Sequence, residues 1–440
     1  MHIKKIVYLF LKTKVMRHER SQPPRGVRAR GARRRTVRRG TDAAAIAICL
    51  LALYAMGCDK LLTTPPLLGD RFDQAMRGLD NGELGDFQDG QVQFRKSFTI
   101  AEGLGPIFNN VSCASCHSGD GRGTTQNILV RFSRGTDLIP GEGGPQIQDR
   151  AIPGAVAEHL PAGVDVSLRM PPPVFGVGLI EAITDSTILS NADPSDADGD
   201  GISGRANMVT PPSYVPAAQP GSGPGLRVGR FGRKAQVSSL FQQTVTAYSQ
   251  DMGITSDALP VENVNPLTPP GLPNPDRAND PEVGGQQVND VMQYMRMLNV
   301  PTPGDWTDQR RQGQTLFTNA QCAKCHIPVL HTGPHDIDAV ANRDVTIYSD
   351  LLLHDLGDAL ADNRPDGDAD GHEWRTAPLW GMRIAKEFTN GTFLLMHDGR
   401  AHSVDEAIRL HGGEATAAVN AFLAMTPDER AALIDFVESR

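Results

Sequence analysis

The clearest amphipathic pattern in the chain lies in residues 283–299. Its apolar positions recur three and four residues apart, at Val288, Val291, Met292, Met295 and Leu298. This spacing places them on one face of an α-helix. Asn299 and the prolines at 301 and 303 end the pattern, because proline cannot continue a helix. We expect a helix here that closes the first part of the chain.

Shorter patterns predict three further helices. Residues 94–110 contain the apolar set Phe98, Ile100, Leu104, Ile107 and Phe108. A second helix should run from about Asp305 through Leu316 and Phe317. The last begins at a capping box with proline at its first position, Thr426-Pro427-Asp428-Glu429, and continues with the apolar stripe Leu433, Phe436 and Val437. No strand pattern persists for long, so the fold should be mainly α-helical.

Composition and charge narrow the classes of partner. The 440 residues include 45 glycines and 32 prolines, so long loops should join the helices. Residues 1–58 contain 14 of the 43 Lys and Arg but 2 of the 51 Asp and Glu, which leaves 29 basic and 49 acidic residues in the rest. This acidity argues against nucleic acid and favours a basic protein or a small neutral molecule as partner.

The basic segment belongs to a predicted export signal. Residues 1–40 are followed by an apolar run from Ala43 to Met56 and then by Gly57-Cys58, the order of a secretory signal. A run of about fifteen residues is too short to span a bilayer. Cysteine after a small residue suggests a lipoprotein signal with Cys58 lipidated, although Ala55 stands where leucine is usual. Ordinary cleavage nearby and an uncleaved anchor are the alternatives. We expect an exported protein, either periplasmic or lipid-anchored to a membrane.

Two five-residue segments carry the most specific chemistry. They are Cys113-Ala114-Ser115-Cys116-His117 and Cys322-Ala323-Lys324-Cys325-His326. In C-x-x-C-H, two thiols add to the vinyl groups of one porphyrin and the next residue offers an imidazole to the iron. A zinc site would need a second cysteine pair or H-x₃₋₅-H nearby, and a redox dithiol does not need the histidine. The other two cysteines lie in the leader. The sequence therefore predicts two covalently bound haem c groups.

These segments give the predicted architecture. The fold class is mainly α, with two cytochrome c-like haem domains and long Gly- and Pro-rich loops. We expect a leader over residues 1–58, a tether over 59–90, an N-terminal haem domain over 91–300 and a C-terminal one over 301–440. In each domain a helix precedes the haem segment and another closes the domain, as in an internal repeat.

Two acidic runs have the 1, 3, 5 oxygen spacing of a calcium loop, with glycine at position 6. The first places Asp196, Asp198 and Asp200 before Gly201. Its position 12 is Asn207 where a full loop has glutamate. The second is Asp366-Gly367-Asp368-Ala369-Asp370-Gly371. Each predicts either a Ca²⁺ site or a solvated acidic turn.

Several segments together resemble the bacterial di-haem cytochrome c peroxidase superfamily and, within it, a di-haem oxidoreductase family often labelled thiol oxidoreductases. The likeness covers roughly residues 90–440 and rests on segments 198–205, 229–232, 251–256, 348–355, 374–379, 396–400, 405–408 and 411–415. The thiol label gains no support, because no C-x-x-C remains beyond the two haem segments.

The resemblance implies roles for four residues of the C-terminal part. The peroxidases place the second iron ligand of this haem fourteen residues after the histidine of H-D-G, which is His411 counted from His397. It implies a His326/His411 pair, and two imidazoles lower the redox potential relative to His/Met ligation. A surface role for His411 is the alternative. His397 and Arg400, at the H-D-G-R positions, are candidates for shaping the haem surroundings and for catalysis.

The N-terminal haem departs from the peroxidase pattern. Those proteins have a distal histidine about sixteen residues after the proximal one, but Ser133 stands here. His159, Met170 or no protein ligand are the candidates, and an open position would admit peroxide or another small substrate. The peroxidases also have an inter-haem tryptophan in their first domain, whereas the first tryptophan of this chain is Trp306.

Two functions follow. In the first, the protein is an oxidoreductase with peroxidase-like chemistry at the N-terminal haem and electron transfer through the C-terminal haem. In the second, it is a di-haem electron carrier without substrate chemistry. Either needs an electron donor or acceptor protein, for which a small cytochrome is a candidate.

Overall fold

A computed structural model describes residues 69–440, which belong to one compact unit, Pro66–Arg440. The predicted leader, residues 1–58, and the start of the predicted tether lie outside the described residues. In the part of the chain that is described, no helix is long and apolar enough to cross a membrane.

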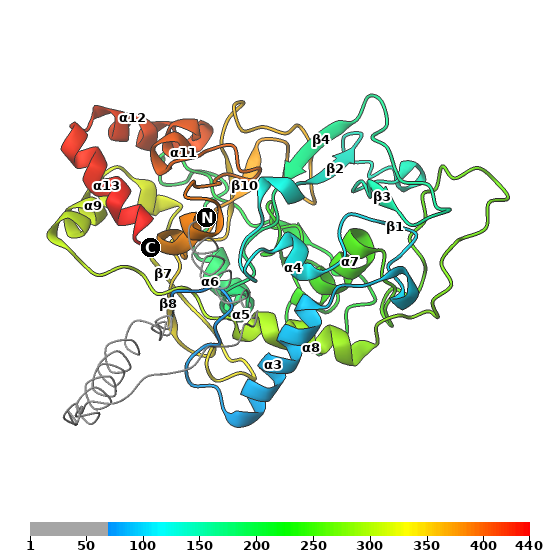
Figure 1. The fold of residues 1–440 in the computed structure, drawn as a ribbon. Coiled ribbons are helices and arrows are strands. Elements are labelled where there is room, and N and C mark those ends of the chain that lie inside the picture. The colour runs from blue at the N-terminus through cyan, green and yellow to red at the C-terminus, as the bar shows by residue number, and fades with distance from the viewer. Residues whose placement is uncertain (1–68) are drawn as a thin grey trace, which may run out of the picture. The chain divides into compact units, whose positions relative to one another are not determined.

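Helices dominate the described part of the chain, as the sequence predicts (Figure 1). The longer ones are α3 (Asn81–Arg95), α7 (Leu240–Met252), α8 (Gly285–Met297), α9 (Asp308–Asn319), α12 (Thr416–Ala424) and α13 (Pro427–Glu438). The shorter ones are α4 (Cys113–Cys116), α5 (Val177–Ala182), α6 (Asp185–Leu189), α10 (Met382–Ala385) and α11 (Val404–Leu410).

The strands are short and form five antiparallel pairs. The pairs are β1 (Ile107–Phe108) with β3 (Arg150–Ala151), β2 (Leu129–Ser133) with β4 (Asp165–Arg169), and β5 (Met208–Val209) with β6 (Arg227–Val228). The other two are β7 (Val329–His331) with β8 (Asp344–Thr346), and β9 (Leu353–Asp355) with β10 (Glu373–Arg375). Strands this short cannot form a layer of the fold, and their hydrogen bonds connect neighbouring loops instead.

The prediction of a helix over residues 94–110 was wrong. The first helix of the described residues is α3, which begins inside the predicted tether and ends at Arg95. The Asp80 side chain caps it by accepting from the Glu83 amide at 2.8 Å, and the Glu83 carboxylate accepts from the Asp80 amide. After Lys96 the chain is extended and irregular. Phe98, Leu104 and Ile107 are buried and Ile100 is exposed. A 3₁₀ turn over Ile100–Glu102 ends at Gly103, whose φ of 93° interrupts a helix.

The three other predicted helices are confirmed as α8, α9 and α13. The Thr307 hydroxyl caps α9 by accepting from the Arg310 amide at 3.1 Å. Thr426 and Glu429 form the predicted capping box of α13, with Pro427 at its first position. Leu433, Phe436 and Val437 are buried, as the pattern requires.

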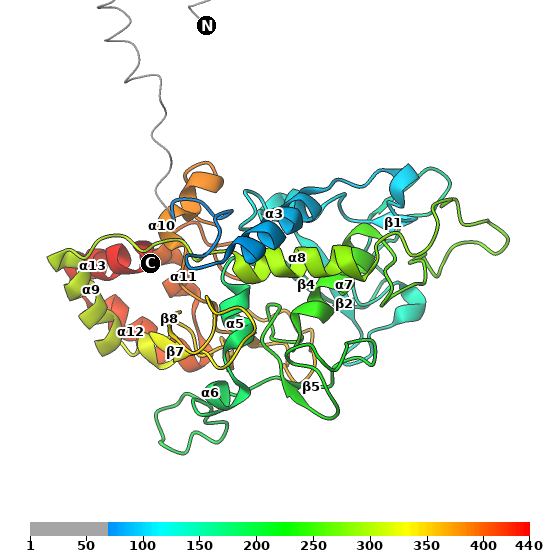
Figure 2. The ribbon, with the colours of Figure 1, turned by 90° about the horizontal axis from the view of Figure 1, so that it is seen from below.

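Two close helix crossings repeat the same arrangement in the two halves of the described chain. The most extensive contacts between helices are those of α3 with α8 and of α9 with α13, and Figures 1 and 2 show both pairs side by side. Gly90 of α3 meets Asp290 and Tyr294, while Gly313 of α9 meets Ala432 and Phe436. A Cβ atom at either glycine would clash with a backbone carbonyl of the partner helix.

One turn after each glycine, a phenylalanine points toward a haem segment. Phe94 lies 5.3 Å from the Tyr294 ring and 6.1 Å from the His117 ring. Phe317 lies 5.5 Å from the Phe436 ring and 6.3 Å from the His326 ring. The repeat is visible in the sequence as G-Q-V-Q-F over 90–94 and G-Q-T-L-F over 313–317. Each helix crossing thus positions an aromatic ring against one candidate iron ligand.

The larger hydrophobic cluster joins residues from both sides of position 300, including Phe94, Tyr294, Leu351 and Trp380. A second cluster is formed by the C-terminal helices around Phe317, Phe422 and Phe436. The division of the chain at residue 300 stays a prediction.

We expect Gly90→Ala and Gly313→Ala each to lower the free energy of unfolding by about 1–3 kcal/mol, because the added methyl forces the crossing helices apart. Gly85→Ala is the control, since Gly85 lies in α3 with no atom within 4 Å of the position its Cβ would take. It should raise stability by about 0.5–1 kcal/mol. Urea unfolding of the three variants tests this, and equal effects at all three positions would contradict the close crossings.

Candidate haem-binding site

The first C-x-x-C-H segment forms a short turn whose thiols and imidazole face one cavity. Cys113–Cys116 is the helix α4, which the Ser112 hydroxyl caps by accepting from the Ser115 amide at 3.1 Å. The His117 amide donates to the Cys113 carbonyl at 2.9 Å. Both cysteines are free thiols, and all three functional side chains line the cavity.

The second segment has the same arrangement on a tighter turn. A 3₁₀ turn spans Cys322–Lys324, and the His326 amide donates to the Cys322 carbonyl at 3.0 Å. Gln321 enters the turn at a φ of 67°. Cys322, Cys325 and His326 line the same cavity as the first segment. The structure therefore brings both Cys-Cys-His sets, more than 200 residues apart in sequence, to a single continuous cavity.

Both proximal histidines are held in the neutral form that binds iron. Burial lowers the pKa of His326 to about 4, although its Nδ1–H donates to the Tyr348 carbonyl at 2.9 Å. Burial also lowers the pKa of His117 to about 4. The Nδ1 atom of His117 has no hydrogen bond of good geometry. The nearby Pro172 carbonyl nevertheless acts to raise the pKa of His117, against the effect of burial.

His411 shares the cavity with His326, as a ligand pair requires. Its Nδ1–H donates to the Ala407 carbonyl at 2.7 Å, which leaves Nε2 free. Burial lowers its pKa, and its charged form would lower the pKa of His326, so the two rings lie near each other. Two imidazoles, each oriented by a backbone carbonyl, are available to one iron.

Neither proposed ligand for the first iron lies in the cavity wall. His159 is exposed. Met170 is 1 % exposed, and its amide donates to the His397 carbonyl at 2.9 Å, but it is not among the lining residues. Of the three alternatives for the first iron, these positions favour an open site.

Asp251, which the sequence reasoning did not single out as a site residue, lies beside the first pair of cysteines. It belongs to α7 and lines the cavity. Burial raises the pKa of both Cys113 and Cys116, and the charge of Asp251 raises it further. Burial raises the pKa of Asp251 to about 6, although the side-chain amide of Gln146, which donates to it at 2.7 Å, acts to lower that pKa. A carboxyl with this pKa exchanges protons near neutral pH.

Three arginines in the cavity wall have no carboxylate partner among residues 69–440. Arg122, Arg233 and Arg375 donate only to backbone carbonyls, such as Leu394, Met170 and Gly232. Burial lowers the pKa of Arg122 and Arg375 to about 10, and burial with repulsion by neighbouring arginines lowers that of Arg233 to about 9. Buried cations of this kind are strong binding groups for carboxylates. The mainly apolar cavity with free thiols, neutral imidazoles and unpaired guanidinium groups fits porphyrins that carry propionates.

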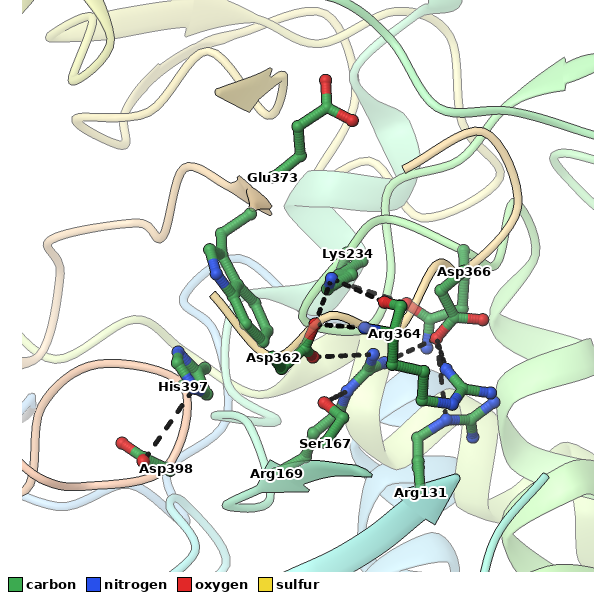
Figure 3. Close-up of polar contacts among 12 residues, drawn as sticks. Arg131, Ser167, Arg169, Lys234, Asp362, Arg364, Asp366, Glu373, His397 and Asp398 are labelled. Atoms are coloured by element: carbon green, nitrogen blue, oxygen red, sulfur yellow. Dashed lines mark hydrogen bonds and ion pairs between the residues drawn. The ribbon is translucent and has the colours of Figure 1, made fainter. Parts of the chain in front are cut away.

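His397 lies in the cavity wall, next to a buried polar network (Figure 3). Its ring stacks on Trp374 at 3.7 Å between centroids, and burial lowers its pKa to about 4. Lys234 lies 4.5 Å from the Trp374 ring centre and donates to Asp362 at 2.8 Å. Arg400 is exposed, outside the cavity wall, and pairs with Asp398 at 2.7 Å. Of the two catalytic candidates, the structure brings only His397 to the cavity.

The two acidic runs differ in their burial and in their ion pairs. Asp193, Asp196 and Asp198 lie together on the surface, whereas Asp200 pairs with Lys324 at 2.7 Å. Calcium binding there stays a prediction. In the second run, Asp366 is buried and pairs with Arg169 at 2.7 Å and Arg364 at 3.0 Å. These arginines hold its pKa well below the usual range despite burial, so this carboxylate stabilises the network in Figure 3.

A histidine with unusual electrostatics lies beside the second cysteine pair. His354 contacts Asp350 at 2.8 Å and Glu414 at 2.7 Å, and its Nδ1 lies 3.6 Å from the Cys325 sulfur. Burial disfavours the charged ring, but the two carboxylates raise its pKa to about 12. The two carboxylates therefore favour the charged form of His354 beside the second haem segment.

A family comparison matches most of the chain. The family described as "Di-haem oxidoreductase, putative peroxidase" matches residues 69–135 and 154–440, which include both C-x-x-C-H segments. Kuenenia stuttgartiensis hydrazine synthase aligns over 96% of this chain and 100% of its own, at 13% identity and a TM-score of 0.38. A MauG-like protein associated with microbial copper homeostasis aligns over 86% and 95%, at 15% identity and a TM-score of 0.34. No curated protein matches the sequence.

We expect His411→Ala to convert the second haem from low spin to high spin without loss of covalently bound haem, because one imidazole is removed and both thiols stay. His402→Ala is the control, since His402 is exposed. The ferric absorption spectrum and a pyridine haemochromogen assay provide the measurement. A low-spin spectrum retained in His411→Ala would exclude His411 as the ligand.

Proposed function

The chain belongs to the di-haem oxidoreductase family, and we propose that it is an exported di-haem c-type cytochrome with peroxidase-like chemistry at its N-terminal haem. One observation carries the proposal, the asymmetry of the two sites. His411, a second imidazole in the shared cavity, lies near His326 of the second Cys-Cys-His set. The first lies beside Asp251, a carboxyl with a pKa of about 6.

Covalent attachment is supported by the four free thiols in the cavity wall. Cys113 and Cys116 would hold the first haem with His117 at its iron, and Cys322 and Cys325 the second with His326 and His411. The bound haems supply one-electron redox chemistry, and a second imidazole lowers the potential of the iron it binds. Arg122, Arg233 and Arg375 would bind the propionates, which would balance the charge of three half-buried guanidinium groups.

At the first site, Asp251 is suited to move a proton. Reduction of peroxide to two waters consumes two electrons and two protons. The Asp251 carboxylate would accept the proton of the bound peroxide and return it to the oxygen that leaves as water. The Gln146 side chain, which donates to Asp251 at 2.7 Å, would hold the carboxyl in place. The electrons would come from a donor protein through the C-terminal site.

Two tryptophans support an electron route between the sites. Trp374 and Trp380 line the cavity that both cysteine pairs share. Lys234 lies 4.5 Å from the Trp374 ring centre, and a positive charge at that distance disfavours removal of an electron from the ring. Trp380 is buried in the larger hydrophobic cluster and is therefore the better relay. Trp380 would then have the role of the inter-haem tryptophan that lies in the first domain of the peroxidases.

The compartment and the partner are inferred from the sequence alone. The order of charges and apolar residues in 1–58 supports export, with lipid attachment at Cys58 and a periplasmic or membrane-surface location. The excess of acidic residues beyond position 58 supports a basic electron-transfer partner, such as a small cytochrome.

We expect Asp251→Asn to slow the reaction of the protein with hydrogen peroxide by about 10²–10⁴-fold, because a proton acceptor is lost. In the unaltered protein the rate should rise with pH through about 6, since Asp251 is protonated below its raised pKa and ionised above it. The variant should lose this dependence while retaining both haems. Asp149→Asn, at an exposed position, is the control, and stopped-flow absorption gives the rates.

Two results would contradict the proposal. If Asp251→Asn reacts at the unaltered rate and with the same pH profile, Asp251 is not the proton acceptor. If the unaltered protein does not react with peroxide at all, the di-haem electron carrier is the correct function.

A further inference from the structure

A cluster of carboxylates lies in the long loop between α7 and α8, outside the haem cavity. This loop, residues 253–284, contains no helix or strand. It brings Glu262, Asp276 and Glu282 together, and one oxygen from each lies within 4.8 Å of the others. Asp280 is a fourth acidic neighbour, since its charge acts on both Glu262 and Glu282. The three cluster residues come from the middle and the end of the loop.

Each of the three carboxylates has a buried oxygen without a hydrogen-bond partner. The atoms are Oε2 of Glu262, Oδ2 of Asp276 and Oε1 of Glu282. Asp276 is 8 % exposed, and only its other oxygen is satisfied, by the Ala278 amide at 2.8 Å. A buried acceptor left unpaired costs about 1–3 kcal/mol. Three such atoms in one place need a partner, which can be a cation or a proton shared between the carboxyl groups.

The protein supplies too few donors and no positive charge. Thr255 donates its amide to Glu282 at 2.7 Å, but its single hydroxyl contacts both Asp280 and Glu282 and can donate to only one. Within residues 69–440, no basic nitrogen lies within 4.0 Å of these four carboxylates. Burial and repulsion by Asp276, Glu282 and Asp280 raise the pKa of Glu262 to about 8.

We propose that Glu262, Asp276 and Glu282 bind a calcium ion. The ligands are all hard carboxylate oxygens, which suit Ca²⁺, and the set has no imidazole or thiolate for zinc or copper. Magnesium is less suitable, because it retains several waters and is rarely enclosed by protein carboxylates alone. The bound ion would pair with all three orphan oxygens.

The ion would fix the loop that joins two walls of the haem cavity. Thr255 follows α7 by three residues, and Glu282 precedes α8 by three. Asp251 and Met252 of α7 and Val291 and Met295 of α8 line the cavity. Loops of this length without secondary structure are uncommon in compact proteins unless something orders them. Calcium binding should therefore stabilise the fold without contacting either haem.

The surface group Asp193, Asp196 and Asp198 provides a matched control. Its carboxylates already accept from backbone amides, as Asp193 does from Ala197 at 2.8 Å and Asp196 does from Gly201 at 3.0 Å. Lys324 also supplies positive charge to Asp198 at 3.8 Å. These carboxylates have amide or ammonium partners, whereas each carboxylate of the loop cluster keeps one buried oxygen without a partner.

The test uses the purified full-length holo-protein after EDTA treatment, titrated with CaCl₂ in a calorimeter and melted with and without Ca²⁺. We expect one Ca²⁺ per chain at the cluster and a higher melting temperature in its presence. Asp276→Asn and Glu262→Gln should each weaken this binding at least about tenfold, since each removes a ligand charge. Asp196→Asn should leave it unchanged, as should both haem absorption spectra.

Three results would overturn the proposal. The first is an unaltered protein whose calorimetry and melting do not respond to Ca²⁺. The second is Ca²⁺ binding that persists in Asp276→Asn but is lost in Asp196→Asn. The third is a Glu262→Gln variant that melts higher than the unaltered protein in EDTA while neither binds Ca²⁺, which would mean that the carboxyl groups share a proton instead.

Discussion

Two helix crossings with no room for a side chain hold the candidate haem segments in place. Gly90 lets α3 approach α8, and Gly313 lets α9 approach α13. One turn later, Phe94 and Phe317 reach the rings of His117 and His326. The two cavity walls depend on these crossings, because each crossing sets the distance between a helix and the C-x-x-C-H turn that follows it. The repeat extends to the partner helices, where Tyr294 and Phe436 occupy equivalent positions.

Within this repeated frame the two sites differ in the charges around them. The second site has His411 and also His354, whose ring contacts the carboxylates of Asp350 and Glu414. The first has Asp251, whose proton exchanges near neutral pH. Three unpaired arginines lie in the shared cavity wall, where two porphyrins would bring carboxylates. The repeated frame therefore carries different side chains at its two sites, Asp251 on α7 at the first, and His354 on β9 and His411 at the end of α11 at the second.

The sequence predicted what depends on local spacing. The C-x-x-C-H segments and the helices α8, α9 and α13 follow from spacings of a few residues. His411 was implied by the family resemblance, and it lies in the cavity wall. The helix α3 was missed because its sequence is polar and its apolar residues are sparse, although Asp80 and Glu83 form a readable capping box and G-Q-x-x-F occurs in both halves. Asp251, the three arginines and the Glu262 cluster depend on burial and on contacts distant in sequence, which no local pattern reveals.

The most direct test of the central claim is an electron paramagnetic resonance spectrum of the ferric protein, with haem content quantified, before and after addition of peroxide. The account predicts one high-spin and one low-spin haem per chain, with the high-spin signal lost when peroxide is added. Two low-spin haems that do not respond to peroxide, before or after half-reduction, would contradict it and leave an electron carrier.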